Sequence, residues 1–139
     1  MYDNKSIKVL GLKGIHLQRE SLPFLESLAV YNENLEQLDL SNNKLYSLGN
    51  FFKSLSRNWL SKLSILNLAN NQLTHADLKD FLDIFEMGTR AFERLLMVLR
   101  VLNVEGNPFT KLNPKLQIET VKELLEKFYC VPRKTLILI

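Results

Sequence analysis

The spacing of leucines between Leu35 and Leu48 limits what this chain can fold into more than any other feature. In the stretch LEQLDLSNNKLYSL, leucines stand at positions 35, 38, 40, 45 and 48, and an asparagine stands at 43. This spacing has neither the period of an amphipathic helix nor the strict alternation of a half-buried strand. It requires a backbone that is extended for a few residues and then turns away.

The same spacing recurs in three further stretches of the sequence. LSILNLANNQL begins at Leu63 and LRVLNVEGNPF begins at Leu99, and both carry asparagine at the position equivalent to Asn43. IKVLGLKGIHL begins at Ile7 and carries Ile15 at that position. All four stretches match the leucine-rich repeat pattern L-x-x-L-x-L-x-x-N-x-L, in which each repeat adds one strand to a stack.

A short strand followed by a turn explains this spacing. The second and third leucines of each copy are two residues apart, so both point to the same side of a strand and into a core. An asparagine amide both donates and accepts hydrogen bonds, and it can therefore satisfy backbone groups that the turn would otherwise bury without partners. We predict this structural role for Asn43, Asn71 and Asn107.

The four copies predict an α/β fold, a leucine-rich repeat solenoid of four repeats with a helix-and-strand cap at its C-terminal end. Its strands should pair in parallel as one concave sheet, and helices in the long connections should cover the convex side. The predicted strands span residues 8–12, 36–40, 64–68 and 100–104.

Three connections carry the apolar spacing of an amphipathic helix. In SLPFLESLAVYN, Ser21 is the expected N-cap, and a proline follows just inside the helix. In NFFKSLSRNWLSKL, one face contains Phe52, Leu55 and Trp59. In THADLKDFLDIF, Thr74 is the expected cap. The buried stripe of this third helix should comprise Leu78, Phe81, Leu82 and Phe85.

A single domain is expected over residues 1–139, because this length suffices for a continuous core. The repeats should lie near residues 7–34, 35–62, 63–98 and 99–109, and the C-terminal cap at 110–139. The third repeat is lengthened by EMGTRAFERLLMV, residues 86–98. A solenoid exposes apolar core at its ends, and the first repeat has no cap in front of it. We therefore expect a longer protein whose preceding domain lies against the first repeat.

Few residues in the sequence are suited to catalysis or metal binding. The chain has 2 histidines and 1 cysteine, which predicts neither a metal cluster nor an internal disulfide. No phosphate-binding glycine loop or nucleophile motif occurs, so we predict a protein that is not an enzyme and has no cofactor. No apolar run approaches the roughly 20 residues of a membrane span. The cysteine usage favours an intracellular compartment, and no signal peptide is recognised.

Residues between the inward leucines should face outward on the concave side and line up in rows across the strands. The first row, Val9, Gln37, Ile65 and Val101, is largely apolar, and the second, Gly11, Asp39, Asn67 and Asn103, is short and polar. An apolar stripe with a polar border favours a protein-binding surface. A partner protein, or an adjoining domain of the same protein, could cover it equally well. The predicted protein-binding residues are Val9, Gln37, Asp39, Ile65, Asn67, Val101 and Asn103.

Positive charge lies outside these rows. The formal net charge is +3, and its basic excess falls in residues 51–139. Because affinity for a phosphate backbone needs lysine or arginine, any RNA contact should be weak and should lie away from the concave face. Lys53, Arg57 and Lys62 are basic residues of the convex side. The predicted RNA-binding residues are Arg90, Arg94, Lys111, Lys115, Arg133 and Lys134.

Within the leucine-rich repeat class, the chain resembles the repeat domain of the TAP-type mRNA nuclear export factors. The resemblance rests on LGLKGI, LSNNKLYSL, LSILNLANNQL, LNVEGNPF and the closing TVKELLEKFYCVPRKTLILI. It implies a non-catalytic module of a nuclear protein that contacts RNA, adaptor proteins or both. It also implies an RNA-recognition-motif domain before the chain and a nuclear-transport-factor-2-like domain after it.

The residues alone leave a second function open. The chain could be a general intracellular scaffold or regulatory subunit that binds a protein through the concave stripe and has no RNA role. The localisation would then be cytoplasmic or nuclear. The apolar positions Val9, Ile65 and Val101 favour this alternative.

Overall fold

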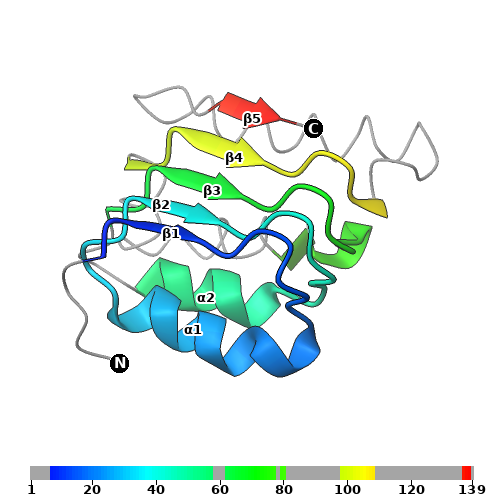
Figure 1. The fold of residues 1–139 in the computed structure, drawn as a ribbon, viewed down its shortest axis with the longest axis horizontal. Helices are drawn as coiled ribbons and strands as arrows, with labels where there is room; N and C mark the ends of the chain where they lie inside the picture. Colours follow the sequence, from blue (N-terminus) through cyan, green and yellow to red (C-terminus); the bar gives the residue numbers. More distant parts are fainter. Residues whose placement is uncertain (1–6, 58–61, 78, 81–97, 109–135, 139) are drawn as a thin grey trace.

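A computed structural model describes residues 7–57, 62–77, 79–80, 98–108 and 136–138 of the chain. Within these residues, five short strands form one sheet in the order β1-β2-β3-β4-β5, and every neighbouring pair is parallel. The strands are β1 (Val9–Gly11), β2 (Gln37–Asp39), β3 (Ile65–Asn67), β4 (Val101–Asn103) and β5 (Leu136–Leu138). The predicted parallel sheet is confirmed, and the strand predicted in TLILI joins it (Figure 1).

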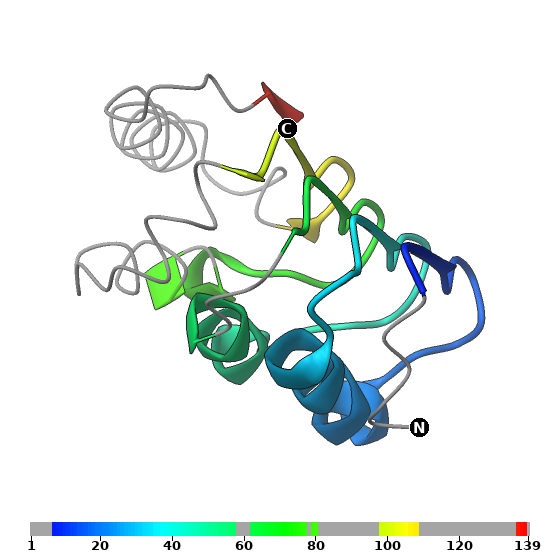
Figure 2. The same ribbon diagram turned by 90° about the vertical axis from the view of Figure 1, so that its left-hand side faces the viewer.

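Two helices lie side by side on one face of the sheet. They are α1 (Leu22–Tyr31), which follows a 3-10 turn η1 (Arg19–Ser21), and α2 (Gly49–Arg57). Figure 2 shows both on the same side of the strands. Among the described residues, no helix covers the opposite face, which is the concave side. The architecture is an α/β leucine-rich repeat solenoid, as the spacing of leucines predicts.

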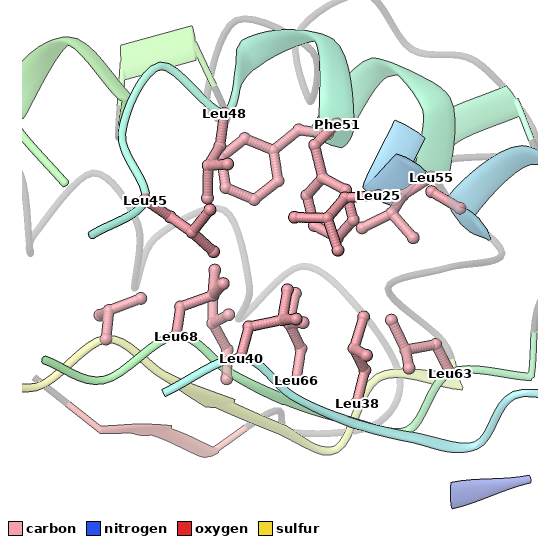
Figure 3. Packing of buried hydrophobic residues seen from close by; sticks show 14 of the residues in the cluster. Leu25, Leu38, Leu40, Leu45, Leu48, Phe51, Leu55, Leu63, Leu66 and Leu68 are labelled. Carbon is pink, nitrogen blue, oxygen red and sulfur yellow. The ribbon is translucent and has the colours of Figure 1, made fainter. Parts of the chain in front are cut away.

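The core fills the space between the sheet and the helices. Figure 3 shows Leu38 and Leu66 on the strand side, facing Leu25 and Phe51 on the helix side. The register pairs Leu10 with Leu38 and Leu38 with Leu66, so the inward leucines stack in line. Leu10 is only half-buried, because β1 is the first strand and has a neighbour on one side only.

Phe51 is the main core residue that the helical spacing did not predict. Its side chain is 0% exposed, and its ring centroid lies 5.8 Å from that of Phe52. The predicted residues Phe52 and Leu55 are also buried. Both phenylalanines are therefore buried, so the apolar face of α2 is wider than the sequence pattern indicated. Trp59 lies outside the described residues.

The start of α1 differs from the prediction in one respect. Ser21 occupies the N-cap position, but its backbone is already helical and its side chain makes no capping hydrogen bond. Its hydroxyl oxygen instead accepts a hydrogen bond from the backbone N–H of Gln18 at 3.4 Å. The cause is η1, which continues directly into α1 and moves the capping function back to the preceding turn.

Asp77 fixes the helical turn that begins after Thr74. One carboxylate oxygen accepts a hydrogen bond from the Leu48 N–H at 2.8 Å, and the other accepts one from the Thr74 N–H at 3.0 Å. Asp77 is buried. The sequence predicted that Thr74 would cap this turn, but the Thr74 hydroxyl donates to Asp77, and the carboxylate carries the capping role. All four residues of the predicted stripe, Leu78, Phe81, Leu82 and Phe85, lie outside the described residues.

A ladder of asparagines joins successive repeats. The Asn43 Nδ2 donates to Leu12 O at 2.9 Å and to Leu40 O at 3.0 Å, and its Oδ1 accepts from Leu17 N at 2.9 Å. Asn71 bonds Leu40 O and Leu45 N of the repeat before it in the same way. Asn107 does so with Leu68 O and Leu73 N. The predicted structural role of all three asparagines is confirmed.

The direction of the ladder explains why Ile15 replaces asparagine in the first repeat. Each asparagine bonds backbone groups of its own repeat and of the repeat before it. For Asn43 and Asn71, no side-chain bond to the repeat after them occurs among the described residues. Asn43 already satisfies Leu12 O and Leu17 N. Among the described residues no strand precedes β1, so no described turn needs an amide at position 15, and an apolar side chain is tolerated there.

The residue before each ladder position adopts a left-handed backbone conformation. Its φ is +64° at Gly14, +55° at Asn42, +54° at Asn70 and +69° at Gly106. Glycine adopts this conformation freely, and asparagine is the most tolerant of the other residue types. This turn directs the chain away from the sheet after each strand, and it explains why only these two residue types occupy the position.

The asparagine ladder predicts unequal effects at two adjacent positions. Asn43→Ala should lower the free energy of unfolding by at least about 1–3 kcal/mol, because it leaves buried backbone groups without partners. Asn42→Gly should be nearly neutral, because glycine accepts the same φ. Chemical denaturation of both variants checks this. Equal stability of the two variants would show that the ladder contributes little.

The inward leucines give a second prediction. Leu66 is fully buried and lies in the centre of the sheet. Leu66→Ala should lower the free energy of unfolding by about 2–5 kcal/mol, as for other buried leucines. Leu10→Ala should cost clearly less, because Leu10 is only half-buried. Urea denaturation of the pair measures the difference, and a reversed order would contradict the assigned core.

Candidate protein-binding surface

The apolar row predicted from the sequence runs straight across the sheet. The register pairs Val9 with Gln37, Gln37 with Ile65, and Ile65 with Val101, so the four residues occupy equivalent strand positions. Val9 is 63% exposed, Gln37 is exposed, and Ile65 and Val101 are half-buried. Leu136 follows Val101 in the same register. With strands about 4.8 Å apart, five such positions span about 19 Å.

The polar row beside it has a structural role that the sequence did not reveal. Asp39 Oδ1 accepts a hydrogen bond from Ser41 N at 2.9 Å, and the Ser41 hydroxyl donates to the same oxygen at 2.6 Å. Asn67 Oδ1 accepts from the backbone N–H two residues ahead at 3.1 Å, and Asn103 Oδ1 does so at 3.0 Å. These side chains hold the bends that end β2, β3 and β4. The signal in the sequence was an Asp or Asn two residues after the outward position of the first row.

A third predicted row, formed by the next outward positions Lys13, Ser41, Ala69 and Glu105, does not form a continuous surface. Ser41 is 4% exposed and Ala69 is 6% exposed, although both were expected to face outward. The chain leaves the sheet at these residues, through the left-handed Asn42 and Asn70, so their small side chains lie within the turn. The open concave surface therefore consists of the first two rows.

Acidic and basic side chains are sparse on these two rows. Asp39 is the charged residue among the described members of both rows, and its Oδ1 is already engaged by Ser41. The first row is otherwise apolar or carries the neutral amide of Gln37. Such a surface offers apolar contact at its centre and hydrogen-bonding groups along one border, which is the composition of many protein interfaces.

The residues predicted to contact RNA lie where the structure gives no description. They are Arg90, Arg94, Lys111, Lys115, Arg133 and Lys134. Of the convex basic residues, Lys53 and Arg57 are exposed on α2. Lys62 is exposed as well, and its ammonium donates to Asn34 Oδ1 at 3.3 Å. Lys53 and Arg57, on α2, are therefore separated from the concave rows by the core.

Two further searches of the described residues give negative results. No group of three or more histidine, cysteine, aspartate or glutamate side chains is placed to hold a metal ion. No described helix has the length and apolar character needed to cross a membrane.

Two segments of the chain match the Leucine Rich Repeat family model, residues 34–58 and residues 62–84. They coincide with the second predicted repeat and with the first part of the third. A match of this kind is typical of protein-interaction modules. No curated protein sequence matches the chain significantly.

One solved structure of similar fold is titled "Leiomodin-1 Actin-Binding Site 2 (ABS2)". The TM-score is 0.64, the sequence identity is 15%, and the match covers 97% of this chain and 70% of that chain. At this identity the likeness shows the fold alone. Neither comparison bears on mRNA export, so the resemblance to export factors stays a prediction.

Proposed function

We propose that the chain is a protein-interaction module whose binding site is the concave row of Val9, Gln37, Ile65 and Val101. The observation that carries this proposal is the row itself, which places apolar side chains at equivalent positions on neighbouring strands and exposes them in part. Burial of apolar area supplies the main driving force of protein association. The neighbouring polar row is already ordered by its own hydrogen bonds, so binding would order few additional side chains.

The composition of the face favours a protein over a nucleic acid as its ligand. Binding to RNA depends on lysine and arginine contacts to phosphate, and the described members of the two rows include neither. Asp39 on the same face would repel phosphate. A protein segment with apolar side chains complements the row without this penalty.

Two sources of the protein ligand remain proposals. The resemblance to export factors favours an adaptor protein or an adjoining domain of the same nuclear protein. The fold neighbour is titled as an actin-binding site, which makes actin a second candidate that purified components can test directly. A general scaffold without any RNA role would use the same concave row.

A double substitution tests the concave row. Ile65→Glu with Val101→Glu should weaken the affinity for a protein partner by at least tenfold, because two carboxylates would enter an apolar contact. Tenfold corresponds to about 1.4 kcal/mol of binding free energy. Bound proteins would be compared between wild type and variant by quantitative mass spectrometry. Each candidate, and purified actin, would then be titrated with the purified chain by calorimetry.

The control carries the same change of charge on the opposite side. Lys53→Gln with Arg57→Gln lowers the net charge by as much as two added glutamates, but it alters the exposed face of α2. This variant should bind as the wild type does. Circular dichroism and melting must show that all variants fold. If a partner binds the folded concave variant at full strength, the concave row is not the site.

RNA binding through the basic residues is a second candidate function, favoured by the basic excess in residues 51–139. Affinity for a single-stranded oligouridine should be weak and should fall with salt, with a slope of log K against log salt of about −0.7 per phosphate contact. Fluorescence titration at low and at physiological salt measures it. Variants that replace Arg90 and Arg94, or Arg133 and Lys134, by glutamine would locate the contacts.

The concave variant serves as the control for the RNA measurement. Ile65→Glu with Val101→Glu should leave a basic site outside the concave face largely unchanged. No binding at low salt, or binding that salt does not weaken, would remove RNA from the direct role of this chain. The scaffold function would then be the remaining one.

A further inference from the structure

We propose that the edge of β1, which no other strand of the described residues pairs with, accepts an extended peptide strand from a partner protein, with apolar residues at alternate positions and acidic residues flanking them. This site lies at the edge of the sheet, and the concave row lies on its face, so the inference goes beyond the proposed function. Figure 1 shows β1 as the outermost strand.

The hydrogen bonds of β2 show which backbone groups of β1 face outward. Toward β1, Asp39 O accepts from Leu12 N at 2.8 Å, and Ser41 O accepts from Gly14 N at 3.0 Å. Toward β3, Leu40 N donates to the next strand at 2.9 Å. Successive residues of a strand thus bond to opposite neighbours, as in any parallel ladder.

The same alternation applies to β1. Val9 and Gly11 pair in register with Gln37 and Asp39 of β2. The backbone groups of Gln37 and Asp39 bond to β1, which is the strand before β2. The backbone groups of Val9, Gly11 and Lys13 therefore point away from β2. Within the described residues, no hydrogen bond reaches them. An extended peptide is the ligand whose own N–H and C=O groups repeat with the matching period.

The side chains at the β1 edge of the sheet favour an apolar peptide as the ligand. They disfavour a further leucine-rich repeat packed in front of β1. Ile15 is 52% exposed and Val9 is 63% exposed. A further leucine-rich repeat in front of β1 would need an amide at position 15 to satisfy its turn, as Asn43 does for the first repeat. A Cβ atom on Gly11 would meet no atom within 4 Å, so the concave face is open at this position of β1.

Charge decides between a second copy of this chain and an acidic partner. Lys8 and Lys13 are exposed and flank the outward-facing part of β1. Pairing of two copies through this edge would bring the exposed lysines of both copies to the same seam, where their like charges repel. Lysines on an edge strand oppose self-association for this reason. Aspartate or glutamate at both ends of a peptide would pair with them instead.

The test uses a displayed library of random peptides selected against the purified chain. Selected sequences should show acidic residues on both sides of an apolar alternation. Synthetic peptides from the selection would then be titrated with variants of the chain. Recovery of no peptide above the background of the unselected library, or of peptides without this pattern, would overturn the proposal.

Two substitutions at Gly11 separate backbone pairing from other contacts. Gly11→Pro removes an edge-facing N–H, and an edge strand tolerates proline where its N–H faces solvent. Binding should fall at least tenfold. Gly11→Ala keeps the N–H and has open space for its Cβ, so it should bind as the wild type does. Equal binding by Gly11→Pro and Gly11→Ala, with both folded, would contradict strand addition.

Reversing the charge of the two edge lysines gives a second test, which remains available if Gly11→Pro does not fold. Lys8→Glu with Lys13→Glu should abolish binding of the acidic peptides and favour versions in which lysine replaces their acidic residues. An unchanged preference for the acidic peptides would overturn the proposal. Ile65→Glu with Val101→Glu should leave peptide binding at the edge intact, so failure of the edge site and failure of the concave site are distinguishable.

Discussion

The buried asparagine amides are the interaction on which the solenoid depends. Each of the strands β1 to β4 is followed by a turn that leads the chain away from the sheet, and the polar backbone groups of that turn lie against an apolar core. One side chain satisfies the turns of two repeats at once, because Asn71 bonds Leu68 O of its own repeat and Leu40 O of the repeat before it. Burial of the stacked leucines supplies the driving force for folding. The amides make burial of the turn possible, because they provide hydrogen-bond partners for its backbone groups.

A division of labour along each repeat follows from this ladder. The leucines and asparagines are committed to the core and the turn, and the residue before each asparagine is committed to a left-handed φ. Asp39, Asn67 and Asn103 are largely committed as well, because each holds the end of its strand. The side chains of the first concave row are not needed for the ladder or for the turns. The residue types in this row are therefore free to be adapted to a partner.

The sequence predicted the parts of the fold that follow from periodicity. The inward leucines, the parallel order, the row containing Ile65 and the role of Asn43 all depend on spacing alone. The burial of Phe51, the position of the cap near Ser21 and the capping carboxylate of Asp77 did not follow from the sequence pattern, because their surroundings come from other segments. These are the neighbouring helix α1, a preceding turn and Leu48 of the previous repeat. The binding assignments have no such periodic signal, so neither the protein nor the RNA site could be fixed from the chain by itself.

The one-way direction of the ladder has a consequence for how the protein is made. A ribosome releases the turn of each repeat before it releases the asparagine that completes it. The backbone N–H of Leu17 bonds to Asn43 and that of Leu45 bonds to Asn71, and in each case the asparagine is synthesised 26 residues later. The N–H of Leu73 bonds to Asn107, which follows 34 residues later. The lengthened third repeat therefore imposes the longest delay. During synthesis, the third turn would therefore remain without its asparagine for longer than the first or the second turn.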